Sequence, residues 1–183
     1  MMEHKLIVAG FGGQGVMLFG QMVAQAGMIE GKHVTWLPSY GPEMRGGTAN
    51  CTVVVSDEPV ASPVVDKPNE IAIFNIPSLL KFEPMLEEGG VLILNTSMID
   101  RKPERTDIKI IEVPANEVAE KLGTLKAQNM VMLGTYIEVT KVVTVESVFK
   151  ALEQKMTGKK AQFLDVNKKA IEEGMRIARQ QLG

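Results

Sequence analysis

The stretch LIVAGFGGQG, residues 6–15, places four glycines at the end of an apolar run. Residues 5–10, KLIVAG, are continuously apolar after the lysine, which is typical of a parallel strand covered on both faces. After the glycines, residues 16–32 carry apolar side chains at helical spacing, with Gly31 in position to end a helix. The chain therefore opens with a strand, a glycine-rich turn and a helix, which is the beginning of an α/β fold.

The rest of the chain continues this alternation and then ends in helices. Three prolines and a charged loop mark irregular connections at residues 57–69 and 98–107. We expect a single domain over residues 1–183, with a three-layer α/β/α architecture around a mostly parallel sheet. The further strands expected are 33–37, 51–56, 70–75, 91–95 and 108–113, and the further helices are 78–90 (helical or turn-rich), 115–123, 129–143, 144–156 and 165–182.

The composition argues against two classes of partner. A net charge of −2 over 183 residues disfavours nucleic acid, because phosphate binding needs a basic face. No apolar run is long enough to span a bilayer, so we expect no membrane partner. The first residues, MMEHKLIVAG, lack the basic and apolar regions of a signal peptide. We therefore expect a cytoplasmic protein.

Cys51 is the only cysteine, and His4 and His33 are the only histidines. One cysteine excludes an intrachain disulfide, and it excludes an iron–sulfur cluster or a zinc ribbon held by cysteines of this chain alone. The two histidines are far apart and lack a ligand pattern around them, so we interpret both as structural and Cys51 as a buried small hydrophobe. We predict no metal site and no catalytic residue in this chain.

Residues 10–15 have the spacing G-x-G-x-x-G between a strand and a helix, the context in which this motif holds a phosphate. Glycines permit a tight turn and the close approach of a ligand, and the helix N-terminus offers unpaired N–H groups to an anion. A close strand-to-helix turn without a ligand explains the same glycines. The candidate ligand-binding residues of this turn are Gly10, Gly12, Gly13, Gln14 and Gly15.

Two common phosphate-binding motifs do not match this turn. Nicotinamide-binding folds need an acidic residue at the end of the second strand, about 20 residues after the glycines, to hold the ribose hydroxyls. Here the second strand ends in Pro38-Ser39-Tyr40, without an acidic residue. A P-loop is excluded as well, since no G-K-[ST] follows the glycines.

The segment SYGPEMRGGTANC, residues 39–51, combines a proline and three glycines with charged side chains. Proline and glycine favour a rigid loop, and we expect it to leave the carboxyl end of the second strand, where open parallel sheets bind ligands. The Arg45 guanidinium suits a phosphate or carboxylate held by two hydrogen bonds, and a surface pair with Glu43 is the alternative. The candidate residues of this loop are Tyr40, Glu43, Arg45, Gly46 and Gly47.

Three segments together carry a family resemblance: GFGGQG at 10–15, SYGPEMRGGTANCTVVVSDEPVASPVV at 39–65 and QNMVMLG at 128–134. They resemble the gamma subunit of the 2-oxoacid:ferredoxin oxidoreductases, a group that includes the pyruvate, 2-oxoisovalerate and 2-oxoglutarate enzymes. The resemblance covers nearly the whole chain. It implies the gamma-domain fold, domain III of the single-chain pyruvate:ferredoxin oxidoreductases.

The resemblance also implies an enzyme complex that decarboxylates a 2-oxoacid on thiamine diphosphate, passes electrons through iron–sulfur clusters to ferredoxin and releases an acyl-CoA. Thiamine diphosphate, Mg²⁺ and the clusters are expected in partner alpha, beta and ferredoxin-like subunits. The gamma chain is expected to shape the coenzyme A side of the active site. The residues agree independently, because the chain has no set of cluster cysteines and no GDG-type thiamine segment.

Asn129 joins the candidate site as part of the third segment. The polar pair Gln128 and Asn129 opens an apolar helical run, so Asn129 either caps that helix or contacts the active site. A different class of function stays open beside the subunit hypothesis: a free-standing protein that uses the glycine turn to bind a nucleotide or an acyl-CoA.

Overall fold

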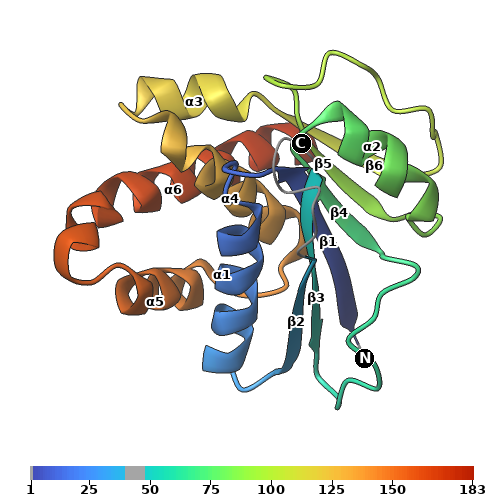
Figure 1. The fold of residues 1–183 in the computed structure, drawn as a ribbon, viewed down its shortest axis with the longest axis horizontal. Coiled ribbons are helices and arrows are strands. Elements are labelled where there is room, and N and C mark those ends of the chain that lie inside the picture. Colours follow the sequence, from blue (N-terminus) through green and yellow to red (C-terminus); the bar gives the residue numbers. More distant parts are fainter. Residues whose placement is uncertain (1, 40–47) are drawn as a thin grey trace.

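The computed structural model describes residues 2–39 and 48–183 (Figure 1). Within these ranges the strands form one six-stranded sheet in the order β2-β3-β1-β4-β5-β6. The strands are β1 (Glu3–Phe11), β2 (His33–Ser39), β3 (Thr48–Ser56), β4 (Glu70–Ile73), β5 (Val91–Asn95) and β6 (Lys109–Val113).

The predicted helices are present with shifted ends. They are α1 (Val16–Ile29), α2 (Ile76–Phe82), α3 (Ala115–Lys121), α4 (Gln128–Thr140), α5 (Val145–Lys155) and α6 (Leu164–Leu182), with 3₁₀ turns η2 (Glu83–Met85), η3 (Leu125–Ala127) and η4 (Gly158–Phe163).

Two predicted boundaries are wrong for local reasons. The strand expected to reach residue 75 ends at Ile73, because the Asn75 side chain already caps α2 by accepting a hydrogen bond from the Ser78 N–H. The helix expected to reach residue 143 ends at Thr140, because Lys141 adopts a left-handed conformation with φ 55°.

The sheet has a parallel part and an antiparallel part. Strands β1, β4, β5 and β6 pair in parallel, whereas β3 is antiparallel to both β1 and β2. Three of the five pairings are therefore parallel, and the predicted mostly parallel sheet is confirmed. Strand β3 lies between β1 and β2, whereas a dinucleotide-binding fold places the first two strands side by side.

Helices cover both faces of the sheet, which confirms the three-layer architecture. Figure 1 shows α1, α4, α5 and α6 on one side and the short α2 on the other. Leu6 and Val8 of β1 pack into the core beneath the larger helical layer, while Ile7 and Ala9 pack with α2 and the irregular segment before β4. Burial on both faces explains why β1 is continuously apolar rather than alternating.

Candidate functional site

The glycine turn connects the carboxyl end of β1 to the start of α1. Gly13 and Gly15 have φ of 89° and 80°, in the left-handed region that favours glycine. Gly15 is the N-cap residue of α1, and no side chain caps the helix there. The first N–H groups of α1 therefore have no partner from a capping side chain, which leaves them able to meet an anion.

Packing explains two of these glycines. A Cβ on Gly10 would lie 2.7 Å from the Cβ of Phe74, and a Cβ on Gly15 would lie 2.4 Å from Nδ2 of Asn129. At Gly13, in contrast, a Cβ would meet no atom within 4 Å. Gly10 and Gly15 thus permit close contacts within the protein, while Gly13 is required only by its backbone conformation.

Gln14 ties the turn to the neighbouring strand. Its Oε1 accepts a hydrogen bond from the Phe11 N–H at 2.6 Å, and its Nε2 donates to the carbonyl oxygen of Phe74 at 3.4 Å. The helices after β1 and β4 cover opposite faces of the sheet, so Gln14 lies at the switch point where open α/β sheets bind ligands. The Gln14 amide is occupied within the protein, and a ligand contact by this residue stays a prediction.

Asn129 comes to the glycine turn from 114 residues away. It is 3% exposed, and its Nδ2 donates to the carbonyl oxygen of Gly15 at 3.2 Å. The neighbouring Gln128 accepts a hydrogen bond from the Asn95 side chain instead of capping α4, whose N-cap residue Ala127 makes no side-chain cap bond. The capping interpretation of this polar pair is therefore wrong, and the structure places Asn129 with the candidate residues of the turn.

The other candidate residues, Tyr40, Glu43, Arg45, Gly46 and Gly47, lie outside the described residues. The ends of the strands that flank them are described. Ser39 pairs with Asn50, and Thr48 pairs with Phe11. Both ends of the segment 40–47 therefore meet the same edge of the sheet as the glycine turn.

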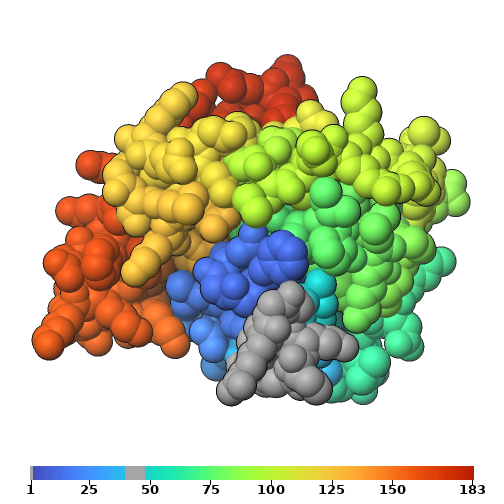
Figure 2. All heavy atoms as spheres, turned by 45° about the horizontal axis from the view of Figure 1, so that its top comes forward, coloured from blue at the N-terminus to red at the C-terminus, as the bar shows by residue number. Residues whose placement is uncertain are grey.

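The carboxyl edge also carries buried amides that are not among the residues predicted from the sequence. Asn75 follows β4 and Asn95 ends β5, and both are at most 1% exposed. Among the described residues, Nδ2 of Asn75 and Oγ of Ser78 have no hydrogen-bond partner. A polar residue directly after an apolar strand, as in EIAIFN and VLILN, is the sequence signal that could have identified them. In Figure 2 a blue part of the early chain reaches the surface between the green region of α2 and the yellow region of α3.

The opposite, amino-terminal edge of the sheet holds a buried network with a structural role. Oε1 of Glu70 lies 2.6 Å from Nδ1 of His4, and Oε2 accepts a hydrogen bond from the Tyr136 hydroxyl at 2.6 Å. Burial and the nearby Glu70 raise the pKa of Tyr136 well above its usual value, so the phenol stays a donor. Both carboxylate oxygens have partners, which agrees with the prediction that His4 is structural.

Cys51 is unsuited to chemistry. It is completely buried, and its thiol donates weakly to the Val16 carbonyl oxygen at 3.6 Å. Burial raises the pKa of the thiol to about 12.

In the part of the chain that the structure describes, no three His, Cys, Asp or Glu side chains are grouped to hold a metal ion. The described helices include none with the length and apolar character needed to cross a membrane.

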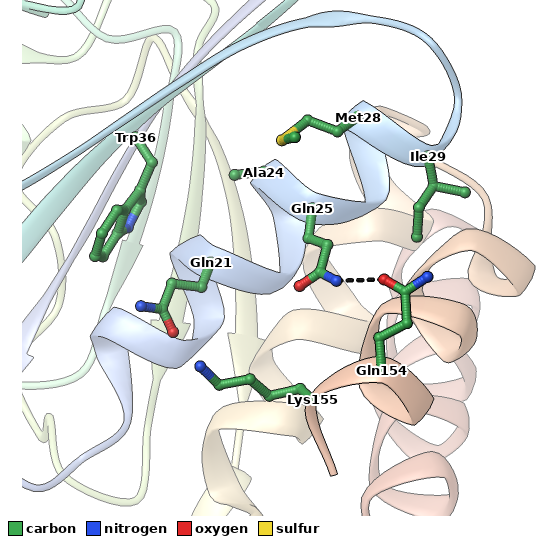
Figure 3. Close-up of a pocket in the computed structure, with 8 residues that line it drawn as sticks. All are labelled: Gln21, Ala24, Gln25, Met28, Ile29, Trp36, Gln154 and Lys155. Carbon is green, nitrogen blue, oxygen red and sulfur yellow. Dashed lines mark hydrogen bonds between the residues drawn. The ribbon is translucent and has the colours of Figure 1, made fainter. Parts of the chain in front are cut away.

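A groove of about 590 Å³ lies away from the candidate residues. It runs along α1 between β2 and α5. Figure 3 shows Gln25 of α1 and Gln154 of α5 joined by a hydrogen bond across it, with Trp36 and Met28 on the other side of α1. It contains none of the residues that the sequence predicted for ligand binding.

Comparisons with known proteins match most of the chain to oxidoreductase subunits or domains. Residues 5–177 match the family model described as pyruvate ferredoxin/flavodoxin oxidoreductase. The chain is 40% identical over 180 residues to ketoisovalerate oxidoreductase subunit VorA of Methanothermobacter marburgensis, covering 98% of this chain and 37% of that one. It is 34% identical over 155 residues to 2-oxoglutarate synthase subunit KorC of Methanocaldococcus jannaschii, covering 82% of each chain.

A solved structure has the same fold. The gamma subunit of a keto/oxoacid ferredoxin oxidoreductase from Geobacter sulfurreducens matches with a TM-score of 0.84 and 27% identity, over 97% of this chain and 99% of that one. The chain thus spans little more than a third of the ketoisovalerate relative but nearly all of this structural neighbour.

Proposed function

The chain belongs to the pyruvate ferredoxin/flavodoxin oxidoreductase family, and from this membership we propose that it is the gamma subunit of a 2-oxoacid:ferredoxin oxidoreductase. The complex converts a 2-oxoacid and coenzyme A into an acyl-CoA and CO₂, with the electrons passed to ferredoxin. The observation that carries the proposal is the near end-to-end correspondence with a protein described as a gamma subunit. Relatives named for ketoisovalerate, 2-oxoglutarate and pyruvate support the 2-oxoacid class of substrate.

The redox groups belong to partner subunits in this proposal. The described residues do not suit thiamine diphosphate with its Mg²⁺, or an iron–sulfur cluster, because they contain no metal-binding group and the single cysteine is buried with its pKa raised to about 12. We therefore assign these groups to the alpha, beta and ferredoxin-like chains, and we assign no redox step to this chain.

The contribution of this chain is to shape the coenzyme A side of the site. Coenzyme A supplies the thiol that takes the acyl group, and its phosphates suit the uncapped start of α1. Gly12 and Gly13 are exposed at that position. Gln14 and Asn129 act as positioning residues, because their amides hold the turn against β4 and α4. Arg45 would add a cation from residues 40–47, whose flanking strand ends lie at the same edge.

The test is reconstitution of the complex with and without this chain. We expect 2-oxoacid-dependent and CoA-dependent viologen reduction only when this chain is present together with its partners. The isolated chain should be colourless and inactive. Turnover by the isolated chain would contradict the proposal. A monodisperse chain that retains a nucleotide or acyl-CoA and binds no partner would instead support the free-standing binding protein.

A further inference from the structure

A separate pocket of about 270 Å³ lies between the first turns of α1, α4 and α6. Its apolar wall includes Leu18, Met156, Phe163 and Val166, from three different parts of the chain. This volume is slightly below the usual range for ligand pockets, and a mixture of apolar walls with a few polar groups is typical of such pockets. The pocket therefore suits a compact ligand with an apolar body.

Two lysines line the pocket. Lys126 comes from η3 and Lys160 from η4, and both are exposed. Neither forms an ion pair with any described residue. The carboxylate of Asp165, in the first turn of α6, is exposed and is not part of the lining. The charge at the pocket is therefore positive, although the chain as a whole carries −2.

Helix α1 adds to this positive potential. The N-cap residues of α1, α4 and α6, which are Gly15, Ala127 and Phe163, make no side-chain cap bond. The 3₁₀ turns η3 and η4 run directly into α4 and α6, so only α1, with 14 residues, presents a free positive end near the pocket. A negatively charged group is favoured there by the two lysines and by the start of α1.

We propose that this pocket binds a small anion, a carboxylate or a phosphate, that is carried on a compact apolar group. The anionic group would lie between Lys126 and Lys160, and the apolar group would pack against Met156 and Phe163. Asn129 links this pocket to the glycine turn, because it lines the pocket and donates to the Gly15 carbonyl oxygen. The inference does not depend on the proposed subunit role.

The experiment titrates the full chain with phenyl phosphate and with benzoate, using calorimetry and the NMR signal of the Met156 methyl group. Inorganic phosphate and benzyl alcohol are the controls that carry only one half of the proposed ligand. We expect at least one of the two amphipathic anions to bind saturably and to shift the Met156 signal. Either control should bind about tenfold more weakly or not at all.

Paired variants identify the site. The double variant Lys126→Gln, Lys160→Gln removes both cations without touching the core, and it should weaken binding about tenfold or more. Lys159→Gln removes one charge by the same kind of substitution on η4, outside the lining, and this variant should bind like the unmodified chain. Absence of saturable binding by both probes, or equal binding by the double variant, would overturn the proposal. Binding by phenyl phosphate alone or benzoate alone supports it and identifies the anionic group.

Discussion

Asn129 of α4 fills the space in which a side chain on Gly15 would lie. Its Nδ2 donates to the Gly15 carbonyl oxygen at 3.2 Å, and a Cβ on Gly15 would approach that nitrogen to 2.4 Å. The contact joins the start of α1 to the start of α4, and it makes the last glycine of the turn necessary without a ligand. A glycine in a G-x-G-x-x-G sequence is therefore not by itself evidence of a bound phosphate in this protein.

Gly15→Ala should destabilise the chain by about 2–4 kcal/mol, because it adds a steric clash with Asn129 to the cost of a positive φ. Gly31→Ala is the matched control, since Gly31 has φ 76° and open space around its Cβ position. It should cost only about 1–2 kcal/mol, the backbone part alone. Urea unfolding measures both losses. Equal losses for the two variants would show that Asn129 does not constrain the turn.

The crossing of α4 and α6 should tolerate no added methyl group. A Cβ on Gly134 would lie 2.0 Å from the Ile171 carbonyl oxygen, and a Cβ on Gly174 would lie 2.0 Å from that of Val131. Both obstacles are backbone atoms, which a rotamer change cannot move. Gly134→Ala should therefore lower the free energy of unfolding, measured in urea, by about 3 kcal/mol or more, although alanine favours a helix. Unchanged stability would contradict this close crossing.

Cys51 should resist thiol reagents in the folded chain. Burial raises its pKa to about 12, so almost no thiolate exists near neutral pH, and the sulfur has no access to solvent. We expect negligible reaction with a disulfide reagent in native buffer at about pH 8 and stoichiometric reaction in urea. Because Cys51 is the only cysteine, the unfolded chain is its own control. Rapid stoichiometric labelling of the native chain would contradict its buried position.

Glu138 should make stability depend on pH in the acid range. Burial by itself would raise the pKa of Glu138, but hydrogen bonds from Lys141 and Arg179 outweigh it and hold the pKa below its ordinary value of 4.5. The unfolded carboxylate thus binds a proton more readily than the folded one. The stabilisation is complete above the ordinary value and is lost as the pH falls through the lower folded pKa.

The ion pairs of Glu138 should contribute about 0.5–1 kcal/mol to the free energy of unfolding, because the side chains of Lys141 and Arg179 are mostly exposed. The measurement compares the urea midpoint of the unmodified chain with that of Glu138→Gln, from about pH 7 to about pH 3. The difference between the two chains should shrink toward the acid end. A difference in urea midpoint that stays constant or grows as the pH falls would contradict a lowered pKa of Glu138 in the folded chain.

The predicted role of Arg45 can be tested in the reconstituted complex by measuring both assembly and kinetics. Removing a charge-assisted pair from a desolvated site costs on the order of 2–5 kcal/mol, so Arg45→Ala should impair either CoA use or assembly. A raised KM for CoA with intact assembly would indicate a ligand contact, and loss of assembly would indicate an interface role. Arg45→Lys should recover only part of the loss, because lysine lacks the planar fork.

Arg101→Ala is the matched control, since Arg101 forms an exposed pair with Glu104. It should leave both assembly and kinetics unchanged. If Arg45→Ala also leaves assembly and kinetics unchanged, Arg45 has no role in ligand binding or in the subunit interface.

Features of this protein that depend on neighbouring residues can be predicted from its sequence. The continuously apolar run before Gly10 predicts β1, and the helical spacing after Gly15 predicts α1, because each periodicity is a local property of the backbone. The alternation of such elements also predicts the three-layer α/β/α class. The three segments that resemble the gamma subunits indicated the family, which the comparisons confirm.

Contacts between residues that are distant in the sequence follow from the packing of the whole fold. The insertion of β3 between β1 and β2, the bond from Gln14 to the Phe74 carbonyl oxygen and the contact of Asn129 with Gly15 join residues far apart in the sequence. Such contacts depend on how whole elements pack, since their geometry is set by the sheet order and the helix crossings rather than by local preference. The same reason explains why the pocket between α1, α4 and α6 has no sequence signature: its lining converges from segments more than 100 residues apart.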